Sequence, residues 1–324
     1  MSRRMTIWFA VAAILAVLGV VIFMGVMSSL KWDFRKLSTV KYETNRHEIV
    51  GGFSDISVLT STADVVFLPT DEEVATVECF EQKKVKHTVS VKDGELTIEV
   101  NDERTWYEHI GISFRTPKIT VRIPAGEYGA LSVKSNTGDT RIPADFVFRS
   151  IEVTATTGDV ELRASATENV RITLTTGDIE VEDVSAHAME LSVTTGEIEA
   201  TRVTCVGGVT ANVSTGDVEL MAVTCGTFSS NGSTGDFFAR NLLGFEKIEI
   251  KRSTGDVEFE MMNSRDISIM TDTGDVEGSL LTGKIFDARS DTGRVRTPDS
   301  DPSSGERCKV RCDTGSIKIT VAQQ

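Results

Sequence analysis

The sequence predicts an all-β protein: a parallel β-solenoid (β-helix) of about ten coils of 19–20 residues, with an N-terminal β cap and one preceding transmembrane helix. Three features predict this fold: an uncharged apolar run near the N-terminus, a Thr-Gly pair that recurs at nearly constant spacing, and apolar residues that alternate on both sides of each pair. A repeat of this length cannot bury an apolar face by itself, so neighbouring coils must stack.

The N-terminal apolar run covers residues 7–27 and contains no charged residue. As a helix it would span about 31 Å at 1.5 Å per residue, which matches a bilayer core of ~30 Å. A cleaved signal peptide has a shorter run, of about 7–15 residues, and small residues at its cleavage site. Because Met27-Ser28-Ser29-Leu30 is a poor cleavage site, we expect an uncleaved anchor, with a cleaved signal or a buried helix as the alternatives.

The charges around this run bear on its orientation. Arg3 and Arg4 lie in the short N-terminal tail of residues 1–6. Lys31, Arg35 and Lys36 lie in residues 28–50, which we expect to be a juxtamembrane linker. The cytoplasmic flank of a membrane helix is usually the more basic one. Because the two flanks carry nearly equal numbers of basic residues, this rule gives little evidence for the orientation. We expect a single-pass protein of the cell membrane with the tail inside and the large domain outside.

The Thr-Gly pair defines the regular part of the solenoid, residues 131–324. Its glycines follow one another at steps of 20, 19, 19, 20, 19, 20, 19, 19 and 22 residues. They are Gly138, Gly158, Gly177, Gly196, Gly216, Gly235, Gly255, Gly274, Gly293 and Gly315. Seven of them continue into aspartate: Asp139, Asp159, Asp178, Asp217, Asp236, Asp256 and Asp275. The other three continue into Glu197, Arg294 and Ser316.

Apolar residues stand seven and five positions before most of these glycines and two positions after them, as Val170, Ile172 and Ile179 do around Gly177. Period two on both sides of a turn predicts strand, corner and strand with one face buried. Glycine permits the positive φ that a sharp corner needs. A further apolar position predicts a third face: Val184, Val203, Val223, Leu242, Met262 and Leu281.

Residues 51–130 are less regular and are predicted to form the cap. Ser61-Thr62-Ala63-Asp64 repeats the corner pattern with alanine in place of glycine, which predicts a degenerate first coil. Alternating runs at residues 74–79, 85–91, 96–100 and 119–123 predict further strands, with Asp93-Gly94 as a hairpin turn. Residues 101–111 are predicted to form a loop. Such a cap covers the open edge that a bare solenoid would expose.

Composition narrows the classes of function. The formal net charge is −14, so the surface is soluble and self-repelling and has no basic footprint for nucleic acid. His47, His87, His109 and His187 are scattered without a spacing for acid–base chemistry, and the common hydrolase, zinc-protease and phosphate-loop motifs are absent. We therefore expect no enzyme activity and no catalytic or cofactor-binding residues.

The aspartates after the glycines are the strongest candidate site. Carboxylates stacked ~4.8 Å apart repel one another by about 0.9 kcal/mol in water, so something must offset the repulsion. One reading is structural, with each side chain accepting N–H bonds at its own corner. A second is a Ca²⁺ ladder along the seven aspartates, because calcium favours carboxylate oxygens. A third is a row that faces a ligand, such as a cationic peptide.

The five cysteines are not expected to form a site. Cys308 and Cys312 lie on the inward alternation and should behave as small apolar residues. Cys205 and Cys225 should stack in adjacent coils, where a disulfide is an alternative that its dihedral requirement disfavours. An odd total, with Cys79 alone, argues against a disulfide framework. Cys-x3-Cys without a nearby histidine is a weak zinc pattern.

The N-terminal anchor, the degenerate cap and the repeated Thr-Gly-Asp coils after about residue 50 resemble a bacterial family of domains of unknown function, described as a putative adhesin and also called the toastrack domain. The resemblance implies a β-solenoid in the cell envelope, and it supplies no catalytic residues. It favours a non-enzymatic, adhesin-like binding or display module with a surface ligand. The alternative is a regulatory or scaffold component of an envelope-stress system that responds to antimicrobial peptides, partnered by other membrane proteins.

Overall fold

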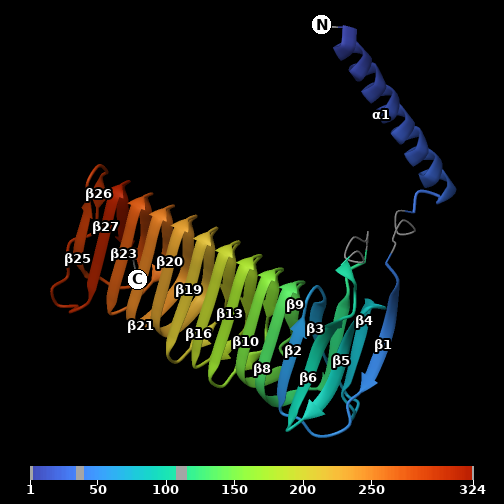
Figure 1. Ribbon diagram of the computed structural model, residues 1–324. Coiled ribbons are helices and arrows are strands. Elements are labelled where there is room, and N and C mark those ends of the chain that lie inside the picture. The colour runs from blue at the N-terminus through green and yellow to red at the C-terminus, as the bar shows by residue number, and fades with distance from the viewer. Residues whose placement is uncertain (1–2, 34–39, 107–114, 323–324) are drawn as a thin grey trace.

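The computed structural model describes residues 3–33, 40–106 and 115–322. Among these residues there is one helix, α1 (Arg3–Ser29), which lies apart from a long stack of strands (Figure 1). Within it, Ile7–Ser29 has a mean hydropathy of 2.9 and none of its most apolar stretch is buried against the protein. This helix is long and apolar enough to cross a membrane.

The rest of the described chain is a parallel β-solenoid of about ten turns, as the repeat predicts (Figure 1). The strands of the regular coils are β8 (Gly126–Thr137), β9 (Thr140–Ile142), β10 (Phe146–Thr157), β11 (Val160–Leu162), β12 (Ser165–Ala166), β13 (Asn169–Thr176), β14 (Ile179–Glu182), β15 (Ser185–Ala186), β16 (Ala188–Thr195), β17 (Ile198–Thr201), β18 (Thr204–Cys205), β19 (Gly208–Thr215), β20 (Val218–Thr234), β21 (Phe237–Thr254), β22 (Val257–Met262), β23 (Asp266–Thr273), β24 (Val276–Leu280), β25 (Ile285–Ser290), β26 (Val295–Arg296), β27 (Arg307–Thr314) and β28 (Ile317–Val321).

Equivalent residues of neighbouring coils pair in parallel register. Val153 of β10 lies beside Ile172 of β13, and Glu161 of β11 lies beside Glu180 of β14. The alternating apolar residues point inward and form one continuous core, so each coil is sealed by its neighbours. The third face also exists: five of its six predicted positions are fully buried, and Leu281 is half-buried.

The cap consists of β1 (Tyr42–Glu48), β2 (Asp55–Thr60), β3 (Asp64–Thr70), β4 (Thr76–Gln82), β5 (Val85–Lys92), β6 (Glu95–Asp102) and β7 (Lys118–Pro124). At the expected degenerate coil, β2 and β3 flank Ala63 and pair in parallel with β8 and β9, as the strands of a coil do. The Asp93-Gly94 hairpin joins β5 to β6, with positive φ at both residues. β1, β4 and β5 are antiparallel and close this end of the stack.

Two boundaries differ from the prediction. Residues 28–50 are not all linker, because β1 occupies Tyr42–Glu48 and pairs with β4 along its whole length. β1 is made of polar and aromatic residues and is held by backbone hydrogen bonds, so apolar periodicity does not reveal it. The predicted loop of residues 101–111 begins inside β6, which runs to Asp102, and residues 107–114 lie outside the described part of the chain.

The order of stacking departs from chain order at both ends. β27 lies between β23 and β25, so the last coil of the chain sits one layer inside the end (Figure 1). β2 likewise lies between β6 and β8. The inner C-terminal coil buries Cys308, Val310 and Ile317, whereas the outermost coil exposes Ile285 and Val295. The more apolar coil therefore occupies the sealed position, and the more polar one forms the end layer.

Candidate functional site

The corners place one row of carboxylates along the solenoid from Asp64 to Asp275. Gly216 represents them: its φ is +129°, and a Cβ there would lie 1.9 Å from the carbonyl oxygen of Gly196 in the preceding coil. Glycine is therefore required for the turn and also for the close stacking of one corner on the next. Gly293 departs from this conformation, since it is the one predicted corner glycine without a positive φ in the described chain.

The aspartate after each corner bonds to the next coil. The carboxylate Oδ1 of Asp159 accepts the backbone N–H of Asp178 at 2.9 Å, and the same bond recurs along the stack at 2.6–3.1 Å. The acceptors are Asp64, Asp139, Asp159, Asp178, Asp217, Asp236, Asp256 and Asp275. The structural reading in which each carboxylate caps its own corner was wrong, because the strand spacing of about 4.8 Å brings the next corner's N–H within reach. We call these bonds the rungs.

The row of rungs has one gap. Asp178 accepts the N–H of Glu197, but no hydrogen bond in the described chain joins the Glu197 carboxylate to the N–H of Asp217. Glutamate is one methylene longer than aspartate, so its carboxylate lies beyond the position that the corner N–H can reach. The row then resumes at Asp217, whose Oδ1 accepts the N–H of Asp236.

We expect Glu197→Asp to restore the missing rung. The variant should be more stable than the wild type by about 1 kcal/mol, the net worth of one hydrogen bond. Thermal or urea unfolding of the full chain measures the gain. Glu199→Asp makes the same change two residues away, where no corner N–H needs an acceptor, and should give no gain. Equal stability of the two variants would contradict the assignment of the rung.

A second row of acids runs beside the first. Three positions after the corner glycine, Glu161, Glu180, Glu199 and Glu219 stand in register on adjacent coils. We call them the outer row. Between the two rows, over the coils from Gly138 to Gly196, lies an open groove of about 320 Å³. The groove is therefore walled on both sides by carboxylates.

The charge of this groove is only partly compensated. Arg141 pairs with Glu161. Arg163 lies within ion-pair distance of Glu161, at 3.3 Å, of Glu180, at 3.7 Å, and of Glu182, at 2.8 Å. Partial burial raises the pKa of Glu197, and the neighbouring carboxylates of Asp217 and Asp178 raise it further. The pKa of Glu199 is raised in the same way, by partial burial and then by Glu219 and Glu180. A cation placed in the groove would relieve this repulsion.

A buried arginine, Arg252, lies on the core side of the row of rungs. Arg252 occupies an inward corner position and is 3% exposed, with its guanidinium over the ring of Phe237. It donates to the Ser230 hydroxyl at 3.0 Å. Gly232 leaves room for the Arg252 side chain, because a Cβ at position 232 would lie 2.9 Å from the Arg252 Cζ. Burial lowers the pKa of Arg252 to about 10, although nearby aspartates of the row raise it.

The calcium ladder stays a prediction. In the rungs each aspartate uses one oxygen, and the other faces solvent without a hydrogen bond or ion pair in the described chain. No three ladder carboxylates of the described residues bring their oxygens within 4.8 Å of one another. In this arrangement a calcium ion would be held by the free oxygens of two adjacent coils and by water.

The five cysteines are buried and free. Cys308 and Cys312 point inward as predicted, and Cys205 and Cys225 lie on neighbouring coils without a disulfide. Burial raises the pKa of Cys79, Cys225 and Cys308 to about 12, so in the absence of a metal ion these thiols are protonated at neutral pH.

The histidines did not all prove to be isolated. His109 lies outside the described residues, and His187 lies beside Gly207 at a turn of the next coil. His87, however, is buried against Glu81 and Thr60 in the cap. The spacing of the histidines in the sequence did not indicate these partners, because they come from β2 and β4 and their proximity depends on the antiparallel hairpin. The sequence analysis also missed the acceptor role of Asp64 and the buried position of Arg252. The Ser61-Thr62-Ala63-Asp64 pattern could have indicated the role of Asp64, because it matches the other corners.

The chain belongs to the Toastrack DUF4097 family, whose model matches residues 53–237. The match begins in the cap and ends in the coil of Gly235, so it covers the groove, the outer row and the row of rungs as far as Asp236. No curated protein matches the chain.

Several solved structures are similar at low identity. A putative adhesin from Bacteroides fragilis is 13% identical, covers 86% of this chain and 97% of its own, and has a TM-score of 0.44. A putative adhesin from Parabacteroides distasonis is 12% identical, with 87% and 98% covered and a TM-score of 0.46. A putative lipid binding protein from the same organism is 14% identical, with 87% and 98% covered and a TM-score of 0.42.

Proposed function

We propose that the protein is a non-enzymatic, adhesin-like module that displays its solenoid outside the cell membrane and binds a cationic ligand in the acidic groove. The observation that carries the proposal is the pair of parallel carboxylate rows, whose charge the described arginines only partly offset. The most fitting ligand is a basic peptide segment in extended form, because its charges could follow the 4.8 Å repeat of the coils.

The architecture supports binding and display. The solenoid is held by rungs and by a continuous core, so the groove is fixed before any ligand arrives and binding costs little ordering of the protein. The hydrophobic helix at the N-terminus would tether this rod to a membrane. The net charge of −14 would keep the rod away from anionic headgroups and attract cationic molecules from solution.

Binding of oligolysine to the full chain in detergent tests the proposal. We expect affinity that falls with salt. The triple variant Glu161→Gln, Glu180→Gln and Glu199→Gln should weaken binding roughly tenfold, the sum of a few exposed ion pairs. A control with the same charge change on other surfaces is Glu152→Gln, Glu168→Gln and Glu190→Gln, and it should bind nearly as the wild type does.

Two outcomes would count against a specific groove. Equal weakening by both triple variants would mean that oligolysine responds only to net charge. Failure of the wild type to bind would exclude a basic peptide as the ligand. In that second case, a melting temperature that rises with calcium and falls with a chelator would favour the calcium ladder in its place.

A further inference from the structure

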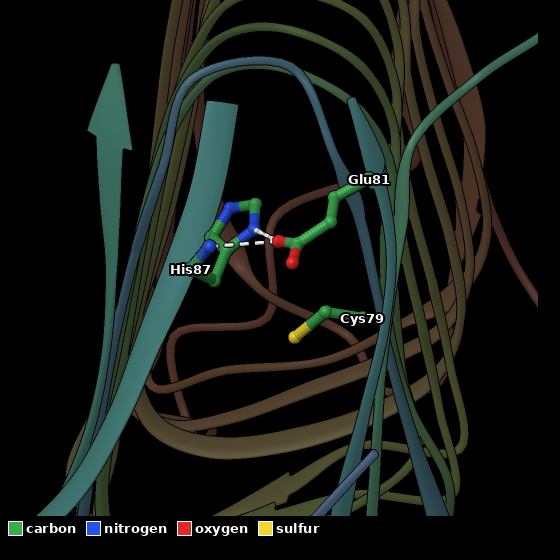
Figure 2. A group of neighbouring side chains, drawn as sticks. All are labelled: Cys79, Glu81 and His87. Atoms are coloured by element: carbon green, nitrogen blue, oxygen red, sulfur yellow. Dashed lines mark hydrogen bonds and ion pairs between the residues drawn. The ribbon is translucent and has the colours of Figure 1, made fainter. Parts of the chain in front are cut away.

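The cap contains a buried polar cluster that the acidic groove does not involve. Cys79 and Glu81 stand two residues apart on β4, so their side chains share the inward face. His87 lies on β5, which follows β4 after a tight turn. Figure 2 shows the three side chains pointing toward one another inside the end of the solenoid.

The cluster is enclosed and closely spaced. Cys79, Glu81 and His87 are 0%, 1% and 6% exposed. The Cys79 sulfur, a Glu81 carboxylate oxygen and a His87 ring nitrogen all lie within 4.8 Å of one another. The Glu81 Oε2 accepts hydrogen bonds from the His87 Nδ1–H at 2.8 Å and from the His87 backbone N–H at 2.7 Å (Figure 2). Asn45 donates to the other oxygen, Oε1, at 2.6 Å.

The same histidine also contacts a hydroxyl. The His87 Nε2 lies 3.0 Å from the Thr60 Oγ1, so Thr60, His87 and Glu81 are arranged as a hydroxyl, a base and an orienting carboxylate. This arrangement has no room to act on a substrate. The adjoining cavity, bounded by Thr60 and His87, measures about 10 Å³, which is close to the space of a single water molecule.

We propose that Cys79, Glu81 and His87 bind a divalent transition metal ion, with zinc as the ion that fits best. One sulfur, one nitrogen and one oxygen donor are a set that zinc accepts in tetrahedral geometry, with water in the fourth position. The charges also balance, because a thiolate and a carboxylate neutralise a divalent cation and the imidazole adds none. A buried site with zero net charge avoids the cost of an uncompensated ion in the core.

Binding moves protons in a defined way. Burial raises the pKa of the Cys79 thiol, and the carboxylate of Glu81 raises it further, so the thiol gives its proton to solvent only as the metal–sulfur bond forms. The Nδ1 of neutral His87, which faces Glu81, becomes the metal ligand, and its proton is replaced by one on Nε2. The Nε2–H then donates to the Thr60 oxygen, and Asn45 keeps its bond to Glu81. Thr60 and Asn45 thus hold two ligands in orientation, as partners of metal-bound groups commonly do.

The ion would tie β4 to β5 at the closed end of the stack. The remaining described cysteines have no such neighbours: Cys205 and Cys225, for example, lie among apolar residues of the regular coils. Cys79 differs from them in having a carboxylate and an imidazole at ligand distance. A buried cysteine without these neighbours, such as Cys225, can therefore serve as the control for Cys79 in the same chain.

Cobalt titration of the metal-stripped, reduced full chain in detergent tests the site. The wild type should bind one equivalent and develop the near-ultraviolet absorption of a thiolate–cobalt bond, which zinc then abolishes by displacement. Cys79→Ser should lose this absorption. Cys225→Ser, which removes an equally buried thiol, should keep it. Thr60→Val should weaken binding by roughly 10–100-fold, the usual effect of removing an orienting partner.

The wild-type titration decides the proposal even if a variant fails to fold. Folded wild-type protein that shows no cobalt absorption and no bound zinc would overturn it. The same absorption in Cys79→Ser would also overturn it, because another thiol would then be the ligand.

Discussion

Gly216→Ala should destabilise the solenoid by at least about 3 kcal/mol. Alanine at a φ of +129° is strained, and its Cβ would lie 1.9 Å from a backbone oxygen of the preceding coil, which cannot move without breaking the register. Because Gly216 lies in the middle of the stack, the damage should divide the solenoid, and the coils on the two sides should lose cooperativity. Thermal unfolding and hydrogen exchange of β19 and β20 measure both effects.

Two control variants separate the causes. Gly305→Ala has a positive φ of +65° and open space around the Cβ, so it should cost only the conformational strain, about 1 kcal/mol. Gly52→Ala has neither constraint and should be close to neutral. If Gly216→Ala costs no more than Gly305→Ala, the close stacking of corners is not what requires glycine.

Lys284→Met should loosen the C-terminal end by about 2–3 kcal/mol, because it removes a half-buried ion pair and leaves the acceptors of a buried ammonium group unpaired. Lys284 is 0% exposed. Its ammonium group pairs with Glu306 and donates to the Ser264 carbonyl oxygen at 2.8 Å and to the Asn263 side-chain oxygen at 2.6 Å. Lys284 itself directly precedes β25, Glu306 directly precedes β27, and Asn263 and Ser264 lie between β22 and β23. The lysine therefore joins the two layers whose stacking order is exchanged to the coil beneath them.

Lys318→Met provides the matched control, because Lys318 pairs with Glu277 on the surface, where both side chains are more than half exposed. Its loss should cost about 0–1 kcal/mol. Hydrogen exchange should show faster opening of β25 to β28 in Lys284→Met and little change in Lys318→Met. Equal protection in the two variants would mean that Lys284 does not hold the end layers.

The regular coils were predictable because their signals are local and repeated. The Thr-Gly spacing located the corners, and the alternation around residues such as Ile172 and Ile179 located the buried face. Even the degenerate coil at Ala63 could be recognised, since only the glycine had changed. The two-residue turn at Asp93-Gly94 followed from the turn chemistry of those residues.

The rest depended on contacts between distant parts of the chain. The sequence marked Asp159 as a turn residue, but whether its carboxylate bonds to its own corner or to the next is decided by the stacking distance. The last two coils are similar repeats, and either could stack directly on β23. The spacing of the Thr-Gly pairs does not reveal that β27 takes this place and that β25 lies outside it. The contact between His87 and Glu81 required the antiparallel hairpin of the cap.

Protease treatment of intact cells that carry a C-terminally tagged full chain tests most directly whether the solenoid is displayed outside the membrane. Lysed cells control for the resistance of the solenoid itself. We predict that the tag is lost from intact cells. A tag that is protected in intact cells and digested after lysis would place the solenoid in the cytoplasm, contradict display, and leave an internal scaffold as the role to examine.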